Sequence, residues 1–142
     1  MMRKWTKWGL CAVAVFAVAG CASTGGGGKE VSDEDAIKAV IDSVLAGLQA
    51  QDIAAMTANY AEDFKSDQGG GKPEMIEFLT GAKDQGFLEG IKVGLDKLTT
   101  TIDGEKATVE PIELEGSFGV LTLSFNLEKR EGSWVITYQA QF

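Results

Sequence analysis

The spacing of apolar residues changes at Gly90, and this change constrains the fold more than any other feature of the sequence. Before Gly90, apolar residues recur every three or four positions, as on one face of a helix; the clearest series is Ile37, Val40, Ile41, Val44, Leu45 and Leu48. After Gly90, apolar residues alternate with polar ones, as in half-buried strands. Helices followed by a run of strands predict an α+β fold, with three helices packed on a mainly antiparallel sheet of four or more strands.

The three expected helices each begin at a recognisable residue. Ser32 is a suitable N-cap for the first helix, because three acidic residues follow it in the first turn. Asp52 is a suitable N-cap for a second helix, which we expect to carry Ile53, Met56, Tyr60 and Phe64. Pro73 suits the first position of a third helix.

The expected strands are separated by turn signals. Asp103-Gly104 and Glu131-Gly132 each predict a hairpin turn. The alternation slips between Leu95 and Leu98, which predicts a bulge or bend in the first strand. Pro111 cannot donate a ladder hydrogen bond, so we expect it at a bulge or a sheet edge. The last strand, by simple alternation, puts Trp134, Ile136, Tyr138, Ala140 and Phe142 on one face.

The N-terminus has the composition of a secretory signal. Arg3, Lys4 and Lys7 precede the uncharged run from Leu10 to Ala19. That run is about ten residues long, whereas a spanning helix needs roughly twenty. Residues 1–20 therefore predict a signal peptide.

Val18-Ala19-Gly20-Cys21 resembles the lipobox of bacterial lipoproteins. The resemblance implies cleavage between Gly20 and Cys21 and acyl chains such as palmitate on Cys21, which would attach the protein to a lipid membrane. We expect residues 21–31, with Gly25 to Gly28, to form a flexible tether. A single domain then covers residues 32–142. Position 22 is Ala and not Asp, which by resemblance favours the periplasmic face of the outer membrane if the source is Gram-negative.

Composition excludes several kinds of function. Without residues 1–20, the chain has 10 basic and 21 acidic residues, a formal net charge of −11, which disfavours nucleic-acid binding. The sequence has no histidine, so histidine-based catalysis and imidazole metal ligands are excluded. Cys21 would be the only cysteine left, so no intramolecular disulfide is expected. Glu110, Glu113 and Glu115 lack the spacing of a calcium loop, and no metal or cofactor site is predicted.

Five motifs in order along the chain resemble the nuclear transport factor 2-like superfamily, also called cystatin-like. They are Leu48-Gln49-Ala50-Gln51-Asp52, Tyr60-Ala61-Glu62-Asp63-Phe64, Gly71-Lys72-Pro73-Glu74-Met75-Ile76, Glu105-Lys106-Ala107-Thr108-Val109 and Gly132-Ser133-Trp134-Val135-Ile136. The resemblance covers roughly residues 33–142 and implies a sheet that curves around the first helix to form a cone with a pocket. The superfamily includes isomerases, dehydratases, cyclases and binding proteins, so the fold does not define the function.

The resemblance also indicates which residues of this sequence stand at the catalytic positions of known members. The oxyanion-binding tyrosine of steroid isomerases falls on Val44, and their catalytic aspartate falls on Gln68, one residue from Asp67. Dehydratases of the superfamily use a His–Asp pair, which this sequence cannot supply. Asp63 and Asp67 therefore remain as the candidates for catalysis; the alternative is that they are solvated residues of a polar loop.

Tyr60, Phe87, Trp134 and Tyr138 are candidates to line an apolar pocket, although such aromatics are often simply core residues. These observations favour a membrane-anchored, non-catalytic module of the cell envelope that binds a small apolar ligand or an envelope protein. One alternative is a small-molecule isomerase or cyclase that uses Asp67 or Asp63. Another is a structural envelope protein that forms a homodimer through its sheet.

Overall fold

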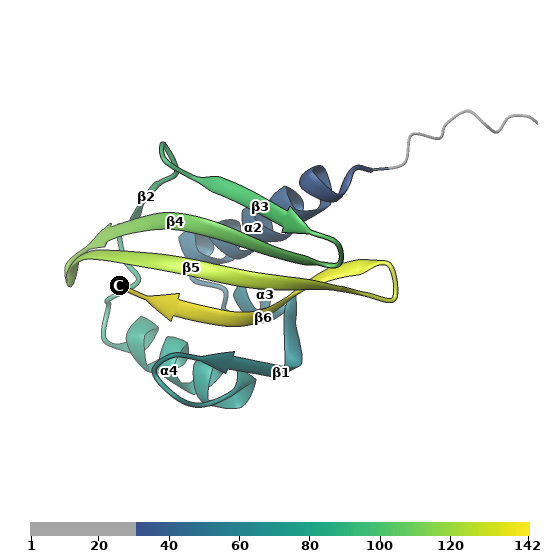
Figure 1. Cartoon of the computed structure of the whole chain (residues 1–142). Helices are drawn as coiled ribbons and strands as arrows, with labels where there is room; N and C mark the ends of the chain where they lie inside the picture. Colours follow the sequence, from purple (N-terminus) through teal and green to yellow (C-terminus); the bar gives the residue numbers. More distant parts are fainter. Residues whose placement is uncertain (1–30) are drawn as a thin grey trace, which may run out of the picture. The chain divides into compact units, whose positions relative to one another are not determined.

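The computed structural model describes residues 31–142, of which Ser32–Phe142 form one compact unit. Figure 1 shows the helices against a curved sheet. The helices are α2 (Asp33–Ala50), α3 (Ile53–Thr57) and α4 (Lys72–Asp84). The strands are β1 (Tyr60–Ser66), β2 (Lys92–Gly94), β3 (Thr99–Asp103), β4 (Lys106–Gly116), β5 (Gly119–Arg130) and β6 (Ser133–Gln141). The expected signal peptide, cleavage site and lipidation at Cys21 lie outside the described residues.

Helix α2 begins at the predicted N-cap, Ser32, and buries the predicted face. The Ser32 hydroxyl oxygen accepts a hydrogen bond from the Asp35 backbone N–H at 3.1 Å, which caps the helix. Gln51 ends the helix in the left-handed conformation (φ 55°), and its N–H reaches carbonyls of the last turn. Near this end, Gly47 lies against the backbone of α3, where the helices approach closely.

The predicted second helix is shorter than expected, because its second half is a strand. Asp52 does cap α3, its carboxylate accepting from the Ala55 N–H at 3.1 Å, but α3 ends at Thr57. Tyr60 and Phe64 instead lie on strand β1, which pairs in parallel with β6. Both side chains are buried, because residues four apart on a strand point to the same face. A spacing of four therefore fits a strand as well as a helix.

The sheet has six strands in the order β1-β6-β5-β4-β2, with β3 also paired to β4. The single bulged strand expected after Gly90 is two short strands, β2 and β3, that pair with different parts of β4. The change of partner falls at Pro111, between Glu110 opposite Thr99 and Glu113 opposite Gly94. The register of β4 against β5 also shifts between Val109 and Ile112, so the bulge predicted at Pro111 is confirmed.

Both predicted hairpin turns are confirmed. Asp103-Gly104 leads from β3 into β4, where Asp103 pairs with Lys106 and Gly104 has a φ of 64°. Glu131 and Gly132 join β5 to β6, and both have positive φ values, as a two-residue turn of the I′ type requires.

The core lies between the inner face of the sheet and α2. The most deeply buried large side chains come from all of these layers: Phe64, Phe125, Ile37, Ile112, Leu127, Ile136 and Val109. Helix α4 contacts β1 and α3, and its buried side chains are Met75 and Leu79. Within the described part of the chain, no helix is both long and apolar enough to cross a membrane.

Asp33 joins the start of α2 to the β5–β6 hairpin. Its Oδ1 accepts from Lys129 Nζ at 2.8 Å and from the buried indole N–H of Trp134 at 3.1 Å. The hydrogen bonds from Lys129 and then from Trp134 hold the pKa of Asp33 below its ordinary value.

A carboxyl with a lowered folded-state pKa stabilises the fold above its unfolded-state pKa, near 4, and this contribution disappears as pH falls through the folded-state pKa. We therefore expect the free energy of unfolding of Asp33→Asn to fall less between pH 5 and pH 2 than that of the wild-type chain. Urea unfolding between pH 7 and pH 2 measures this. An unchanged loss of stability between pH 5 and pH 2 in the variant would contradict it.

Candidate functional site

A large cavity opens between α2, α4 and the inner faces of β4, β5 and β6. Its volume is about 760 Å³, within the range of small-molecule sites. Most of its lining is aliphatic or aromatic: Val44, Leu45, Leu48, Met56, Met75, Phe78, Leu79, Ala82, Phe87, Leu88, Ile91, Leu114, Phe118, Val120, Leu121, Leu123 and Phe125. The cavity therefore suits a ligand that is mainly apolar.

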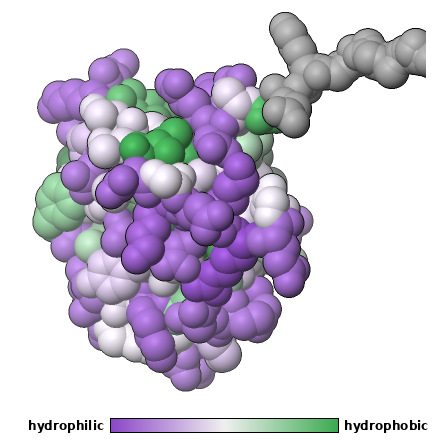
Figure 2. Space-filling model, turned by 45° about the vertical axis from the view of Figure 1, so that its right-hand side comes forward, coloured by the Kyte–Doolittle hydropathy of each residue, from purple (hydrophilic) through white to green (hydrophobic). Residues whose placement is uncertain are grey.

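The mouth of the cavity carries four exposed apolar side chains, which we call the rim. They are Phe78 (62% exposed), Phe87 (41%), Phe118 (42%) and Val120 (69%). Exposed large apolar residues gathered around one opening are typical of binding sites. By contrast, the face of the molecule in Figure 2 is mostly hydrophilic, with only small hydrophobic areas.

The inner end of the cavity carries a buried polar pair, Tyr60 and Gln139. They are 5% and 6% exposed, and the Tyr60 hydroxyl donates to Gln139 Oε1 at 3.0 Å. The Tyr60 ring packs on Phe64 and Phe125, with centroids 4.5 and 6.3 Å away. Burial raises the pKa of Tyr60 well above its ordinary value, so the phenol stays neutral.

The charged groups on the lining are both acidic. Glu74 and Glu77 of α4 line the cavity, and the described lining residues include no lysine or arginine. Glu74 is partly engaged, because its Oε2 accepts from the Gly71 backbone N–H at 2.8 Å, and this hydrogen bond lowers its pKa. The site thus has no cation to pair with an anionic ligand.

Two of the four aromatic residues considered for the pocket, Tyr60 and Phe87, line the cavity. Trp134 does not; it is 3% exposed and hydrogen-bonded to Asp33, at the start of α2. Tyr138 is 36% exposed and is also absent from the lining.

A bulge in β6 explains the position of Tyr138. Leu127 pairs with Ile136, but Asn126 pairs with Tyr138, so Thr137 is an extra residue in β6. After Ile136, the next buried side chain of β6 is therefore Gln139 and not Tyr138. The prediction that alternate residues of the last strand share one face is wrong beyond Ile136. Gln139 was missed for this reason, since no turn or proline signal marks Thr137 in the sequence.

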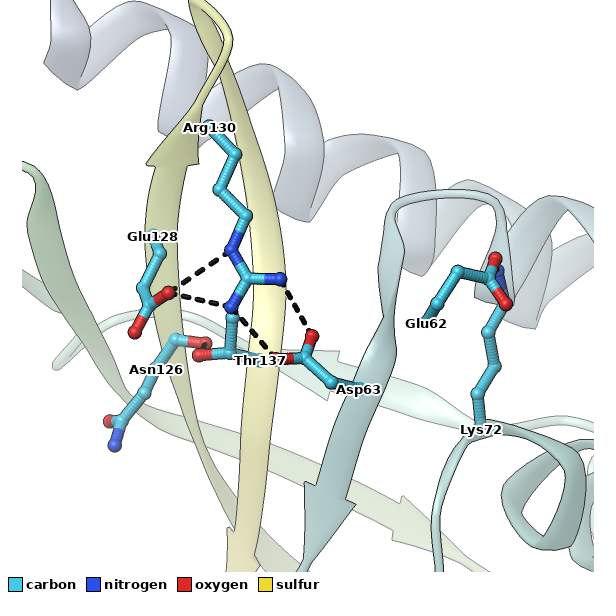
Figure 3. A network of polar contacts seen from close by, with 7 residues as sticks. All are labelled: Glu62, Asp63, Lys72, Asn126, Glu128, Arg130 and Thr137. Carbon is cyan, nitrogen blue, oxygen red and sulfur yellow. Dashed lines mark hydrogen bonds and ion pairs between the residues drawn. The ribbon is translucent and has the colours of Figure 1, made fainter.

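Asp63 lies outside the cavity, in an ion-pair network (Figure 3). Its two carboxylate oxygens accept from Arg130 Nη1 at 2.6 Å and Nη2 at 3.0 Å, and Arg130 also contacts Glu128 at 2.7 Å. The side chain of Asp63 is 65% exposed, and the hydrogen bonds from Arg130 lower its pKa. This is the opposite of what a general base in an apolar pocket requires.

Asp67 also lies outside the cavity lining. Its Oδ2 accepts from the Gln141 backbone N–H at 2.8 Å, and its own N–H donates to the Gln139 carbonyl, so it ties the loop after β1 to the end of β6. Val44, the position of the isomerase tyrosine by resemblance, does line the cavity, but with an apolar side chain. Gln68 lines a smaller neighbouring cavity of about 370 Å³.

Across residues 31–142, no three acidic, histidine or cysteine side chains come together in a group that could hold a metal ion. The polar groups that face the main cavity are Tyr60, Glu74, Glu77, Gln85, Gln139 and Gln141.

Comparison of the sequence with models of protein families and with curated protein sequences finds no match. Solved structures do match the fold. A Nostoc punctiforme protein of unknown function with a cystatin-like fold has a TM-score of 0.63 and 18% identity, over 80% of this chain and 93% of its own. A nuclear transport factor 2-like protein of unknown function from Shewanella baltica has a TM-score of 0.63 and 20% identity, over 81% and 96%.

A third match is a candidate ketosteroid isomerase from Shewanella frigidimarina, with a TM-score of 0.63 and 20% identity over 75% of this chain and 94% of its own. Identities this low establish the fold alone. The nuclear transport factor 2-like fold expected from the sequence is confirmed for the compact unit.

Proposed function

We propose that this chain is a lipid-anchored protein of the cell envelope whose domain, residues 32–142, binds a small apolar molecule without transforming it. The observation that carries the binding proposal is the cavity of about 760 Å³ with its apolar lining and exposed rim. A stable domain rarely leaves so much apolar surface unfilled, because unfilled space forfeits packing contacts. Occupancy by a ligand would recover those contacts.

Binding is tested with prodan, a neutral naphthalene ketone whose fluorescence rises and shifts to shorter wavelength in apolar surroundings. The sample is the mature chain, residues 21–142, carrying Cys21→Ser so that no detergent is needed. We expect saturable binding at one site per chain. A linear, non-saturating signal would contradict the proposed function.

The anchor is supported by Val18-Ala19-Gly20-Cys21 and by the short apolar run before it. We expect mass spectrometry of the protein purified from membranes to give an N-terminal peptide that begins at Cys21 and carries acyl chains. Cys21→Ser should move the protein to the soluble fraction or leave it uncleaved. A mature N-terminus elsewhere, or an unmodified Cys21, would contradict the anchor.

The geometry supports binding better than catalysis. A matched structure is described as a candidate ketosteroid isomerase, but here Asp63 pairs with Arg130 on the surface and Asp67 holds the end of β6. The ionisable groups on the lining are Tyr60, Glu74 and Glu77, and Glu74 is partly engaged in capping α4. None of the aspartates considered for an isomerase or cyclase thus reaches a ligand in the cavity.

A further inference from the structure

Gln139 has an unused hydrogen-bond donor at the inner end of the cavity. Its Oε1 is occupied by the Tyr60 hydroxyl, while its Nε2 donates to no atom of residues 31–142. The side chain is only 6% exposed, and it lines the cavity. A buried amide N–H without an acceptor is costly, so the cavity's occupant is expected to satisfy it.

The hydrogen bond from Tyr60 also decides which end of the amide is available. Because Oε1 receives the phenol proton, Nε2 is the end that remains for a ligand. The backbone of Gln139 is held in place as well, since its main-chain carbonyl accepts a hydrogen bond from the Asp67 N–H. The site therefore presents a positioned donor, and a complementary ligand must bring an acceptor.

The charge of the lining narrows the ligand class. Glu74 and Glu77 are on the lining, and no lysine or arginine of the described chain is among the lining residues. Burial of a carboxylate or phosphate without a cation is strongly unfavourable. The acceptor should therefore be a neutral oxygen.

We propose that the ligand is a neutral, largely apolar molecule with a carbonyl oxygen at its leading end, which accepts a hydrogen bond from Gln139 Nε2 while the rim covers its other end. This inference rests on the proposed function and names the ligand chemistry of the same cavity. The Tyr60 hydroxyl orients the Gln139 amide and is a positioning group.

The test compares 2-acetylnaphthalene with 2-isopropenylnaphthalene, which has nearly the same shape but carries a methylene group in place of the carbonyl oxygen. Dissociation constants are measured by displacement of prodan from the wild-type mature chain and from Gln139→Leu. The ratio of the two constants is compared between the proteins, so the difference in ligand hydrophobicity cancels. We expect Gln139→Leu to reduce the preference for the ketone by roughly tenfold, as loss of one buried hydrogen bond implies.

Tyr60→Phe removes the hydroxyl that orients the Gln139 amide but keeps the amide itself. It should therefore reduce the preference for the ketone less than Gln139→Leu does. A third ligand, 2-naphthoate, should bind the wild-type chain more weakly than the ketone. Equal ratios in wild type and Gln139→Leu, or tighter binding of the carboxylate, would overturn the inference and leave the proposed function intact.

A second measurement does not depend on the folding of Gln139→Leu. In the wild-type chain, the carbonyl stretching band of ¹³C-labelled 2-acetylnaphthalene should lie at lower wavenumber than in hexane, as expected for a hydrogen-bonded ketone. A band at the hexane position would overturn the inference. Failure of every ligand, prodan included, to bind wild type would refute the proposed function itself.

Discussion

Leu121→Trp is expected to weaken prodan binding roughly 70-fold while the domain stays folded. Leu121 lies on β5, is partly buried and lines the cavity. A tryptophan there would occupy space that the ligand needs. A ligand that can no longer bury about 100 Å² of apolar surface loses about 2.5 kcal/mol, which weakens binding roughly 70-fold.

Thr122→Trp is the matched control, since successive residues of a strand point to opposite faces. Thr122 pairs with Glu113 of β4 and is absent from the cavity lining. The same bulky side chain one residue away should therefore leave prodan binding unchanged. If both variants bind like wild type, or both lose binding, the site of prodan is not this cavity.

Gly47→Ala is expected to destabilise the domain, although alanine is the better helix former. A Cβ at Gly47 would lie 2.6 Å from the Met56 backbone nitrogen and 3.0 Å from the Ala55 carbonyl carbon. These are backbone atoms, so α3 must move away from α2. Overpacking of this kind costs about 1–3 kcal/mol and outweighs the helix-propensity gain of about 1 kcal/mol.

Gly81→Ala provides the comparison, because Gly81 also lies within a helix, α4. A Cβ there would meet only the Gln85 side chain, at 3.9 Å. The substitution should stabilise the domain by about 0.5–1 kcal/mol, or a few degrees in Tm. Thermal unfolding of the two variants should thus shift in opposite directions. Stabilisation by both would show that α2 and α3 are not packed as closely as described.

Local signals in the sequence were sufficient for much of the fold. Ser32, Pro73, Asp103-Gly104 and Glu131-Gly132 act within a few residues of their own positions, and each lies at the boundary it predicts. The bulge at Pro111 belongs to the same class, because a missing N–H interrupts any ladder.

Features that depend on distant partners could not be predicted in this way. Whether Tyr60 continues a helix or begins a strand is decided by its pairing with Ile136, far along the chain. The same limit applies to the candidate site: Asp63 lies outside because β1 turns it toward Arg130, and Gln139 lies inside because of an unmarked bulge. Tyr60 was within reach of sequence reasoning because large aromatics favour the interior, whereas Phe87 lines the cavity from its exposed rim.

The extra residue at Thr137 decides how this strand has to be aligned with the strands of related proteins. The Thr137 hydroxyl donates to the Asn126 carbonyl at 3.3 Å, beside the point where the register shifts. Removal of this one residue would restore simple alternation and leave Tyr138 and Gln139 on their present faces. A relative without the bulge would therefore carry its next inward side chain two positions after that of Ile136, where this chain needs three. An alignment without a gap there would pair that inward residue with Tyr138, on the opposite face.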